Sequence, residues 1–369
     1  MPESLGYAAD LVTDLVGDSA PEWDLTGRLP VELLRTLGGK GLLCAEVPAA
    51  YGGLGVDSHT GGEFTAHVGS LCSSLRSILT SQGMAAWTIS RLGSAAQRRD
   101  YLSRLTSGQL AGVAFSEVEA GSDLSAMATE IEADGEFVTV RGDKVWTTAA
   151  AYADLIVVVG RFGSSAAAVV VPTDARGVTV TRVAHPSGCR AAGHADIRFD
   201  DVRLPADAVL GGGGQPLALL VTTALAAGRM SVAWGCVGIL RACLAAASRH
   251  ATDRRQFGKP LADHQLVARR LAELYAAEQV ATRVCEHASH CWDSGSPDMV
   301  AATVLAKLVS STQAVQGSAA AVQVLGSAAA NDGHVVARAY RDAKLMELIE
   351  GSTEICQLML AQHAIATAR

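Results

Sequence analysis

The pattern of hydrophobic and polar positions changes twice along the chain. Residues 1–112 have the pattern of helices: residues 29–34 open one helix, which ends at a pair of glycines at 38–39. Long segments around residues 60–80 and 83–107 then follow with few helix breakers. This part is therefore predicted to be an N-terminal α-helical domain.

Residues 113–215 have the pattern of strands. Hydrophobic residues alternate with polar ones on either side of Asp134-Gly135, a dipeptide typical of hairpin turns. Runs rich in β-branched residues follow at 155–159, 168–171, 178–180 and 197–199. Because no long helical segment separates these runs, they predict a central antiparallel β domain rather than a doubly wound sheet.

Residues 216–369 return to helical spacing. Apolar residues recur at steps of three and four between 266 and 292, and two further long segments cover 297–325 and 338–367. With the apolar segment that opens this part, they predict a C-terminal four-helix-bundle domain with short connections. The predicted fold class is therefore α+β, with a helical domain, a β domain and a bundle in that order.

The composition indicates a folded protein and excludes several classes of function. Of the 369 residues, 49% are hydrophobic and 18% are charged, which excludes a disordered chain. The formal net charge of −7 argues against nucleic-acid binding, because nothing would attract this chain to phosphates. The eight cysteines form no Cys-x-x-Cys pair, and the first residues lack the basic and apolar segments of a secretion signal. We therefore expect a cytoplasmic protein with free thiols.

Residues 217–240 are apolar enough to raise the question of a membrane span. The stretch carries Arg229 near its middle and is rich in alanine, threonine and glycine. A charged side chain is costly at the centre of a spanning helix, whereas a buried helix of a folded protein can pair it. We expect such a buried helix and no membrane insertion.

Two local clusters have both a functional and a structural interpretation. Gly211–Gly214 could hold a phosphate before a helix, but the spacing is not Gly-x-Gly-x-x-Gly, which favours a domain junction. Cys285, His287, His290 and Cys291 could hold a metal, but the cysteines also fall on the apolar stripe of their helix. That position favours core cysteines beside surface histidines, so no metal site is predicted.

Several short motifs have an ordinary structural explanation when each is taken alone. A polar turn follows Ser116, and a strand-like run begins at Lys144. The segment from Arg254 has the cations, glycine and proline of a helix end. Another helix is predicted to end at Gly351 and to restart from a cap at Ser352.

Taken in series, the order and separation of these motifs resemble the acyl-CoA dehydrogenase family. Members of that family are flavoproteins that desaturate acyl thioesters, and their architecture is the α–β–α order predicted above. The resemblance covers about residues 28–365. It is carried by residues 41–43 with 47–48 and 51–55, 116–117 with 120–123, 144 with 146–148, 199–205, 228–229 with 232–233, 254 with 256–260, 341–344 and 349–351.

The resemblance implies an FAD site between the β domain and the bundle, closed at the adenine end by a neighbouring subunit. The cofactor-binding residues it implies are Phe115, Ser116, Gly121, Ser122, Trp146, Thr147, Thr148, Arg254, Phe257, Gln323, Gly326 and Ser352. Thr148 would lie near flavin N5, and Ser122 would meet the pyrophosphate. Arg254 would reach the pyrophosphate from the partner chain, where its forked guanidinium suits phosphate. A homodimer or homotetramer follows.

The resemblance also implies a catalytic base. Glu350 matches the family's base, which takes a proton from the substrate α-carbon while a hydride leaves the β-carbon for flavin N5. A carboxylate becomes useful in this role where a dry pocket raises its pKa. Arg229, inside an apolar helix, resembles a buried arginine near the base, and Gly351 is expected beside the substrate with it.

Departures from the family pattern suggest a specialised branch. They are Ser327-Ala328-Ala329 after Gly326, Cys356-Gln357 near the C-terminus, and Ser81-Gln82 near the substrate channel. Some relatives oxidise short acyl units on acyl carrier protein for polyketide extender units of the hydroxymalonyl or methoxymalonyl type. The substrate is therefore expected to be an acyl thioester on CoA or on acyl carrier protein, with electron-transfer flavoprotein or oxygen as acceptor. The alternatives are a general short-chain acyl-CoA dehydrogenase, a flavin oxidase or monooxygenase of the same fold, and a non-catalytic scaffold.

Overall fold

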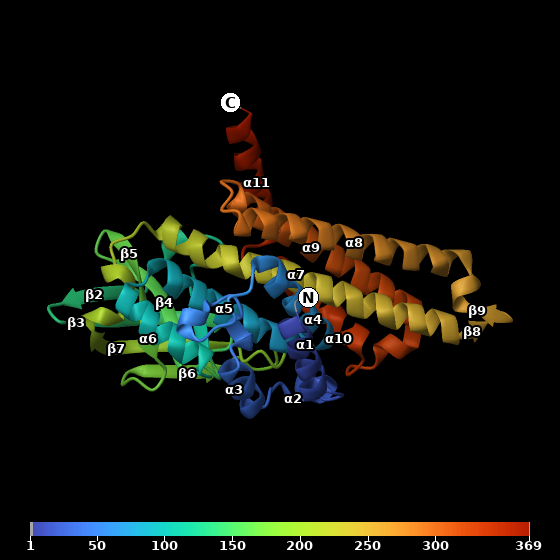
Figure 1. Ribbon diagram of the computed structural model, residues 1–369, viewed down its shortest axis with the longest axis horizontal. Coiled ribbons are helices and arrows are strands. Elements are labelled where there is room, and N and C mark those ends of the chain that lie inside the picture. Colours follow the sequence, from blue (N-terminus) through green and yellow to red (C-terminus); the bar gives the residue numbers. More distant parts are fainter. Residues whose placement is uncertain (1–2, 369) are drawn as a thin grey trace.

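The structure, a computed structural model, describes residues 3–368 and follows the predicted order of helices, strands and helices. The predicted α+β fold class is confirmed: a helical region, a sheet and a helical bundle succeed one another along the chain. Figure 1 shows the sheet at one end of an elongated molecule and the bundle running away from it.

The N-terminal region consists of short and medium helices around its own apolar core. They are α1 (Glu3–Val16), α2 (Ala20–Thr26), α3 (Val31–Gly39), α4 (Ser58–Leu71), α5 (Ser73–Leu92) and α6 (Ala95–Thr106). The two long segments expected at 60–80 and 83–107 are therefore three helices. The first break is at Cys72, whose extended backbone separates α4 from α5. The second is at Ser94, whose side chain caps α6 in a capping box with Gln97.

The central region is a seven-stranded sheet with the order β1-β4-β2-β3-β7-β6, and β5 pairs with β4. The strands are β1 (Ala111–Ala114), β2 (Glu130–Asp134), β3 (Phe137–Thr147), β4 (Leu155–Phe162), β5 (Ser165–Pro172), β6 (Val178–Arg182) and β7 (Ala195–Pro205). The hairpin predicted at Asp134-Gly135 joins β2 to β3, and most neighbours are antiparallel as expected. β1 and β2 instead run parallel to β4, so the sheet is mixed rather than fully antiparallel.

The C-terminal region is a bundle of α7 (Leu217–Asp253), α8 (Gln265–Asp293), α9 (Met299–Leu325) and α10 (Val335–Leu348). The segment expected at 338–367 is two helices, and the second, α11 (Thr353–Thr367), projects away from the bundle in Figure 1. The hairpin of β8 (Arg255–Gln256) and β9 (Lys259–Pro260) follows α7. Gly258, expected to be the stop residue of a helix, lies in the turn of this hairpin with φ +81°.

Helix α7 is long and apolar enough to cross a membrane by length and composition. Of its most apolar window, however, 67% is buried within the protein, against α4, α5, α8, α9 and α10. Its apolar side chains are therefore used in packing the bundle. On α8, Cys285 and Cys291 are buried in the same core, and His287 and His290 are exposed.

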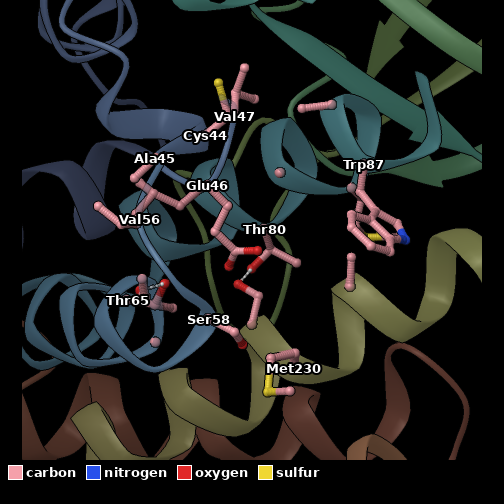
Figure 2. A pocket seen from close by; sticks show the side chains of 18 of the residues that line it. Cys44, Ala45, Glu46, Val47, Val56, Ser58, Thr65, Thr80, Trp87 and Met230 are labelled. Atoms are coloured by element: carbon pink, nitrogen blue, oxygen red, sulfur yellow. Dashed lines mark hydrogen bonds between the residues drawn. The ribbon is translucent and has the colours of Figure 1, made fainter. Parts of the chain in front are cut away.

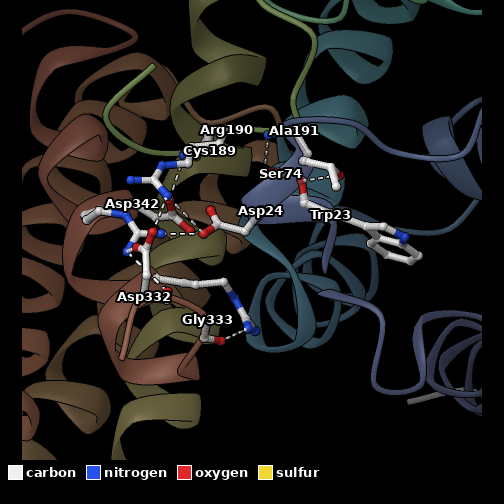
Figure 3. A network of polar contacts seen from close by, with 12 residues as sticks. Trp23, Asp24, Ser74, Cys189, Arg190, Ala191, Asp332, Gly333 and Asp342 are labelled. Atoms are coloured by element: carbon white, nitrogen blue, oxygen red, sulfur yellow. Dashed lines mark hydrogen bonds and ion pairs between the residues drawn. The ribbon is translucent and has the colours of Figure 1, made fainter. Parts of the chain in front are cut away.

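A network of ion pairs joins the three regions (Figure 3). Arg341 on α10 pairs with Asp24 on α2, and with Asp332 at 2.6 Å. Arg190, in the connection from β6 to β7, pairs with Asp332 at 3.0 Å and with Asp24 at 3.6 Å. Because each arginine bridges two carboxylates, the network fixes the β6–β7 connection against both the N-terminal region and the bundle.

Candidate active site

The turn between α10 and α11 carries Glu350 in an unfavourable backbone conformation. Its φ is +57°, and such a left-handed conformation costs a residue with a side chain about 1–2 kcal/mol. Two buried cations hold the turn. The Nε of Arg229 donates to the Glu350 carbonyl at 2.9 Å, and the Nζ of Lys307 donates to the Gly351 carbonyl at 2.6 Å. The sequence motif predicted the turn, whereas nothing in it indicated Lys307.

The Oε2 of Glu350 is buried and has no hydrogen-bond partner among the described residues. Its space comes from Gly228 on α7: a Cβ there would collide with Oε2 and would lie 2.7 Å from the Met84 sulfur. Burial raises the pKa of Glu350 to about 7, against the opposing charges of Arg229 and Lys307. A carboxyl group with this pKa can take up a proton near neutral pH.

Arg229 and Lys307 are almost fully removed from water, at 3% and 0% exposure. Burial lowers the pKa of both groups, and the Nη1 of Arg229 has no partner among residues 3–368. A buried charge is costly unless it is paired or hydrogen-bonded. Here both contact the backbone of the turn that carries the carboxylate.

The loop after β1 carries Phe115 and Ser116 and is fixed by a buried ion pair. Lys144 on β3 donates to Glu117 Oε1 at 2.8 Å and to the Phe115 carbonyl at 2.9 Å. Burial lowers the pKa of Lys144 to about 8. Burial alone would raise the pKa of Glu117. Hydrogen bonds from Lys144 and from two backbone N–H groups nevertheless hold the pKa of Glu117 below its usual value. The Ser116 carbonyl accepts from the backbone N–H of Val145, which ties the loop to β3.

The end of β3 exposes a flat aromatic surface. Trp146 is 55% exposed, has φ +56°, and donates its backbone N–H to Asp196 at 3.0 Å. The ring of His194 lies 5.9 Å from the indole, and its Nδ1 is 3.3 Å from the Thr148 hydroxyl. Burial lowers the pKa of His194 to about 4, so its ring is neutral. The Oγ1 of Thr147 and the Nε2 of His194 are buried without a partner in the described part of the chain.

Gly121 and Ser122 lie in an exposed turn closed by backbone hydrogen bonds between Glu117 and Ala120. Nothing lies within 4 Å of the position that a Cβ would take at Gly121. The turn therefore leaves room for a large group, and its assignment to a pyrophosphate stays a prediction.

The other predicted cofactor residues lie on the bundle. Arg254 closes α7, and Phe257, which is 95% exposed, lies in the β8–β9 hairpin. Figure 1 shows this hairpin at the opposite end of the bundle from the sheet. Gln323 and Gly326 are exposed at the C-terminal end of α9. The structure thus does not bring these four residues to the β-domain residues within one chain.

Ser352 has a structural role in this structure. Its Oγ accepts from the backbone N–H of Ile355 at 3.4 Å and caps α11, as the sequence predicted.

The β-domain residues fit a flavin. An exposed indole beside buried donor and acceptor atoms that lack partners suits a flat ring with hydrogen-bonding edges. The open turn at Gly121 suits a phosphate, because no side chain fills the space before it.

A cavity of about 400 Å³ lies between the loop of residues 42–48 and helices α4, α5 and α7 (Figure 2). Met84, Ala227 and Ser231 line it. Because Met84 also contacts the space beside Gly228, the cavity ends close to the Glu350 carboxylate.

Comparison with known proteins identifies the family. The chain matches the models "Acyl-CoA dehydrogenase, N-terminal domain" over residues 6–109, "middle domain" over 112–202 and "C-terminal domain" over 218–365. Probable acyl-CoA dehydrogenase YngJ of Bacillus subtilis (strain 168) is 30% identical over 364 residues, which are 96% of this chain and 95% of that protein. Glutaryl-CoA dehydrogenase of Desulfococcus multivorans is 30% identical over 354 residues, 93% of this chain and 90% of that protein.

A solved structure described as "FkbI for Biosynthesis of Methoxymalonyl Extender Unit of Fk520 Polyketide Immunosuppresant" is 63% identical. It has a TM-score of 0.94 and covers 97% of this chain and 99% of its own. The chain therefore belongs to the acyl-CoA dehydrogenase family of FAD-dependent oxidoreductases that act on acyl thioesters.

Proposed function

We propose that this protein oxidises a short acyl group across its α and β carbons, with Glu350 as the base that removes the α-proton. One observation carries the assignment: the Oε2 of Glu350 is buried without a partner, on a turn that two buried cations hold in place. A structural carboxylate would be expected to pair with one of those cations, and this one leaves them to the backbone.

Different residues of the chain have the catalytic, positioning and cofactor-binding roles in this reaction. Glu350 accepts the α-proton, since burial raises its pKa to about 7 and makes the uptake favourable near neutral pH. Arg229 and Lys307 fix the direction of the carboxylate through the backbone of its turn. FAD, when bound, accepts the hydride from the β-carbon. Phe115, Ser116 and Trp146 with the two threonines after it would hold its ring, and Gly121 and Ser122 its pyrophosphate.

We further propose that the substrate is a short, oxygenated acyl unit carried on acyl carrier protein for an extender unit of the methoxymalonyl or hydroxymalonyl type. The 63% identity to FkbI over nearly the whole of both chains supports this branch over a general short-chain dehydrogenase of catabolism.

The cofactor site is proposed to be shared between two chains of a homodimer or homotetramer. Arg254, Phe257, Gln323 and Gly326 would then face the β domain of a neighbouring chain. The protein is proposed to be cytoplasmic, with domains at 1–112, 113–215 and 216–369. Its electrons would pass to an electron-transfer flavoprotein or to oxygen.

The test is anaerobic flavin reduction of the holoenzyme by short acyl thioesters, each on CoA and on acyl carrier protein. We expect the carrier-bound thioesters to bleach the flavin fastest. If no thioester bleaches it, the dehydrogenase assignment fails, and if CoA thioesters are as fast, the carrier assignment fails. Hydrogen peroxide in air at the rate of substrate loss would identify an oxidase.

A further inference from the structure

The cavity beside Glu350 is apolar over much of its wall but is also lined by two acidic residues, Glu46 and Asp293. Glu46, from the loop of residues 42–48, extends toward Thr80 in Figure 2. Glu46 lines this space, and its side chain is exposed rather than covered by protein. On α4, Gly61 makes room for it: a Cβ at that position would lie 3.1 Å from Glu46 Oε1.

The carboxyl group of Glu46 has no cation beside it. Its charged neighbours are the acidic Asp293 and Asp57, which, together with burial as the main cause, raise its pKa to about 7. Among the described residues that line the cavity, Arg91 is the single Lys or Arg, and its guanidinium lies over the Trp87 ring at 5.4 Å. No salt bridge or hydrogen bond joins Glu46 to any of residues 3–368. Its hydrogen-bonding capacity is therefore available to a molecule in the cavity.

Two hydroxyl groups add to this polar part of the wall. Thr80 on α5 and Ser231 on α7 hydrogen-bond to each other at 2.7 Å, and both line the cavity. Ser231 is one helical turn from Gly228, whose missing Cβ makes room for the base. An acyl chain whose reacting carbons lie beside Glu350 and whose distal part runs along α7 into the cavity would therefore meet these hydroxyl groups and Glu46.

We propose that Glu46 determines the specificity of the cavity by hydrogen-bonding a hydroxyl group on the distal part of the acyl chain. This inference rests on the proposed function, because it takes the cavity to hold the acyl group. A hydroxyl can donate to the carboxylate or accept from the carboxylic acid, so it suits a group that titrates near neutral pH. A distal carboxylate would instead face Glu46, Asp293 and Asp57, which are all acidic. An alkyl end would displace water from the Glu46 carboxyl group without replacing the hydrogen bonds of that water.

The test compares acyl thioesters in matched pairs, with and without a terminal hydroxyl. Propionyl, butyryl and pentanoyl thioesters and their ω-hydroxy counterparts are offered to the FAD-loaded enzyme, and kcat/KM is taken from anaerobic flavin reduction. For at least one chain length we expect the hydroxylated member to be favoured about 10- to 100-fold. Glu46→Leu should remove that preference, and Glu46→Gln should reduce it by less, since an amide still hydrogen-bonds a hydroxyl.

Gly83→Ala is the matched control, since a Cβ at Gly83 would have nothing within 4 Å. This change narrows the cavity without touching the carboxyl group, so it should alter the preferred chain length and leave the hydroxyl preference within each pair. Equal preferences in wild type, Glu46→Leu and Glu46→Gln would overturn the proposal. So would a wild-type preference for alkyl, ω-amino or ω-carboxy chains.

Calorimetric binding of the same thioesters to the holoenzyme separates this inference from the proposed function. If no thioester reduces the flavin, the dehydrogenase assignment fails, and the binding ratio within each pair still decides the role of Glu46. If Glu46→Leu fails to retain FAD, the role of Glu46 is decided by the binding ratio of the hydroxylated to the alkyl thioester in Glu46→Gln. A ratio equal to that of the wild type rejects the proposal.

Discussion

A carboxylate acts as a base near neutral pH only if its surroundings disfavour its charge without neutralising it through a direct ion pair. Glu350 meets both conditions, because burial raises its pKa to about 7 while Arg229 and Lys307 bond to the backbone and not to its carboxylate. The two cations lie near enough to limit the rise in pKa. The site thus keeps a base that is partly ionised at neutral pH.

Glu350→Gln should retain FAD and lose flavin reduction by about 100- to 10,000-fold, the usual contribution of a general base. In the wild type the reduction rate should rise with pH through about 7, since the carboxylate is the active form. Stopped-flow absorbance of the flavin from pH 5.5 to 9 measures both effects. Near-normal reduction by the variant would remove Glu350 from the role of base.

The same substitution should change how stability depends on pH. The pKa of Glu350 is raised from 4.5 to about 7, so the folded protein holds its proton where the unfolded chain has lost it. The stability contributed by this group is present below 4.5 and is lost as pH rises through 7, by at most about 3 kcal/mol. Glu350→Gln should therefore gain Tm relative to wild type between pH 5 and pH 8. A constant difference would mean that the carboxyl group is not held in a dry site.

Lys307→Met should slow the reaction and leave the cofactor in place. The substitution keeps most of the volume of the side chain but removes the donor to the Gly351 carbonyl, so the turn that aims Glu350 is released. We expect kcat to fall about 10-fold or more while KM changes little, with the pH profile displaced upward because a positive charge near the base is lost. An unchanged pH profile would make Lys307 a merely structural residue.

Sequence reasoning found Glu350 and Arg229 because both belong to motifs, but it missed Lys307, His194 and Glu46. Lys307 reaches the turn from a helix 44 positions earlier in the chain, and its neighbours in sequence are ordinary core residues. His194, just before β7, contacts the hydroxyl group of Thr148, which follows β3 and is 46 positions earlier in the chain. Contacts of this kind depend on tertiary packing and leave no local pattern.

At the scale of elements, α7 links the sheet, the cavity and the base. Gly228 and Arg229 are adjacent on it, one making room for the Glu350 carboxylate and the other binding its carbonyl. The apolar sequence that first suggested a membrane span is instead explained by the packing of this helix against α4, α5, α8, α9 and α10.

Gly228→Ala should impair the enzyme although alanine is the better helix former by about 1 kcal/mol. The new Cβ would occupy the space of the Glu350 carboxylate and would lie 2.7 Å from the Met84 sulfur. We expect kcat to fall about 10-fold or more with FAD retained, as overpacking forces the carboxylate to move. Gly83→Ala, on α5, is the control: its Cβ would meet open space in the cavity, so the variant should keep flavin reduction with at least one acyl chain length, whereas Gly228→Ala should lose it with all.

Elements whose ends depend on local chemistry could be predicted, and those whose ends depend on packing could not. The hairpin at Asp134-Gly135 and the cap at Ser352 followed from residue type. The break at Cys72 did not, because cysteine carries no signal for an extended backbone. The glycine at 258 was assigned to a helix stop, but the chain forms a hairpin there that has few contacts within its own protomer.

At the scale of the whole molecule, most of the predicted cofactor residues form two groups at opposite ends of the protein. Trp146 and its neighbours lie on the sheet, and Arg254 and Phe257 lie at the distal end of the bundle (Figure 1). An indole 55% exposed and a phenyl ring 95% exposed are costly to leave in water. Both are explained if each covers part of a cofactor that spans two chains.

Arg254→Ala should weaken FAD binding about 10- to 100-fold, because charge-assisted hydrogen bonds to a phosphate would be lost. Fluorescence titration of the apoprotein with FAD measures the change, and circular dichroism verifies the fold. Arg255→Ala, at the adjacent exposed position, is the control and should bind FAD more tightly than Arg254→Ala. Tight, unchanged binding by Arg254→Ala would argue against a site shared at this hairpin.

Hybrid oligomers test the shared site directly. One chain carries Glu350→Gln, which removes the base and keeps the hairpin; the other carries Arg254→Ala with Phe257→Ala, which keeps the base and impairs the hairpin. In a hybrid pair, one site combines both defects and the other combines the intact Glu350 of one chain with the intact hairpin of its partner. Random pairing of equal amounts should then restore about a quarter of the wild-type flavin reduction, measured at an FAD concentration too low to load the hairpin variant alone. If every site were built within one chain, the co-expressed mixture would be no more active than the average of the two variants.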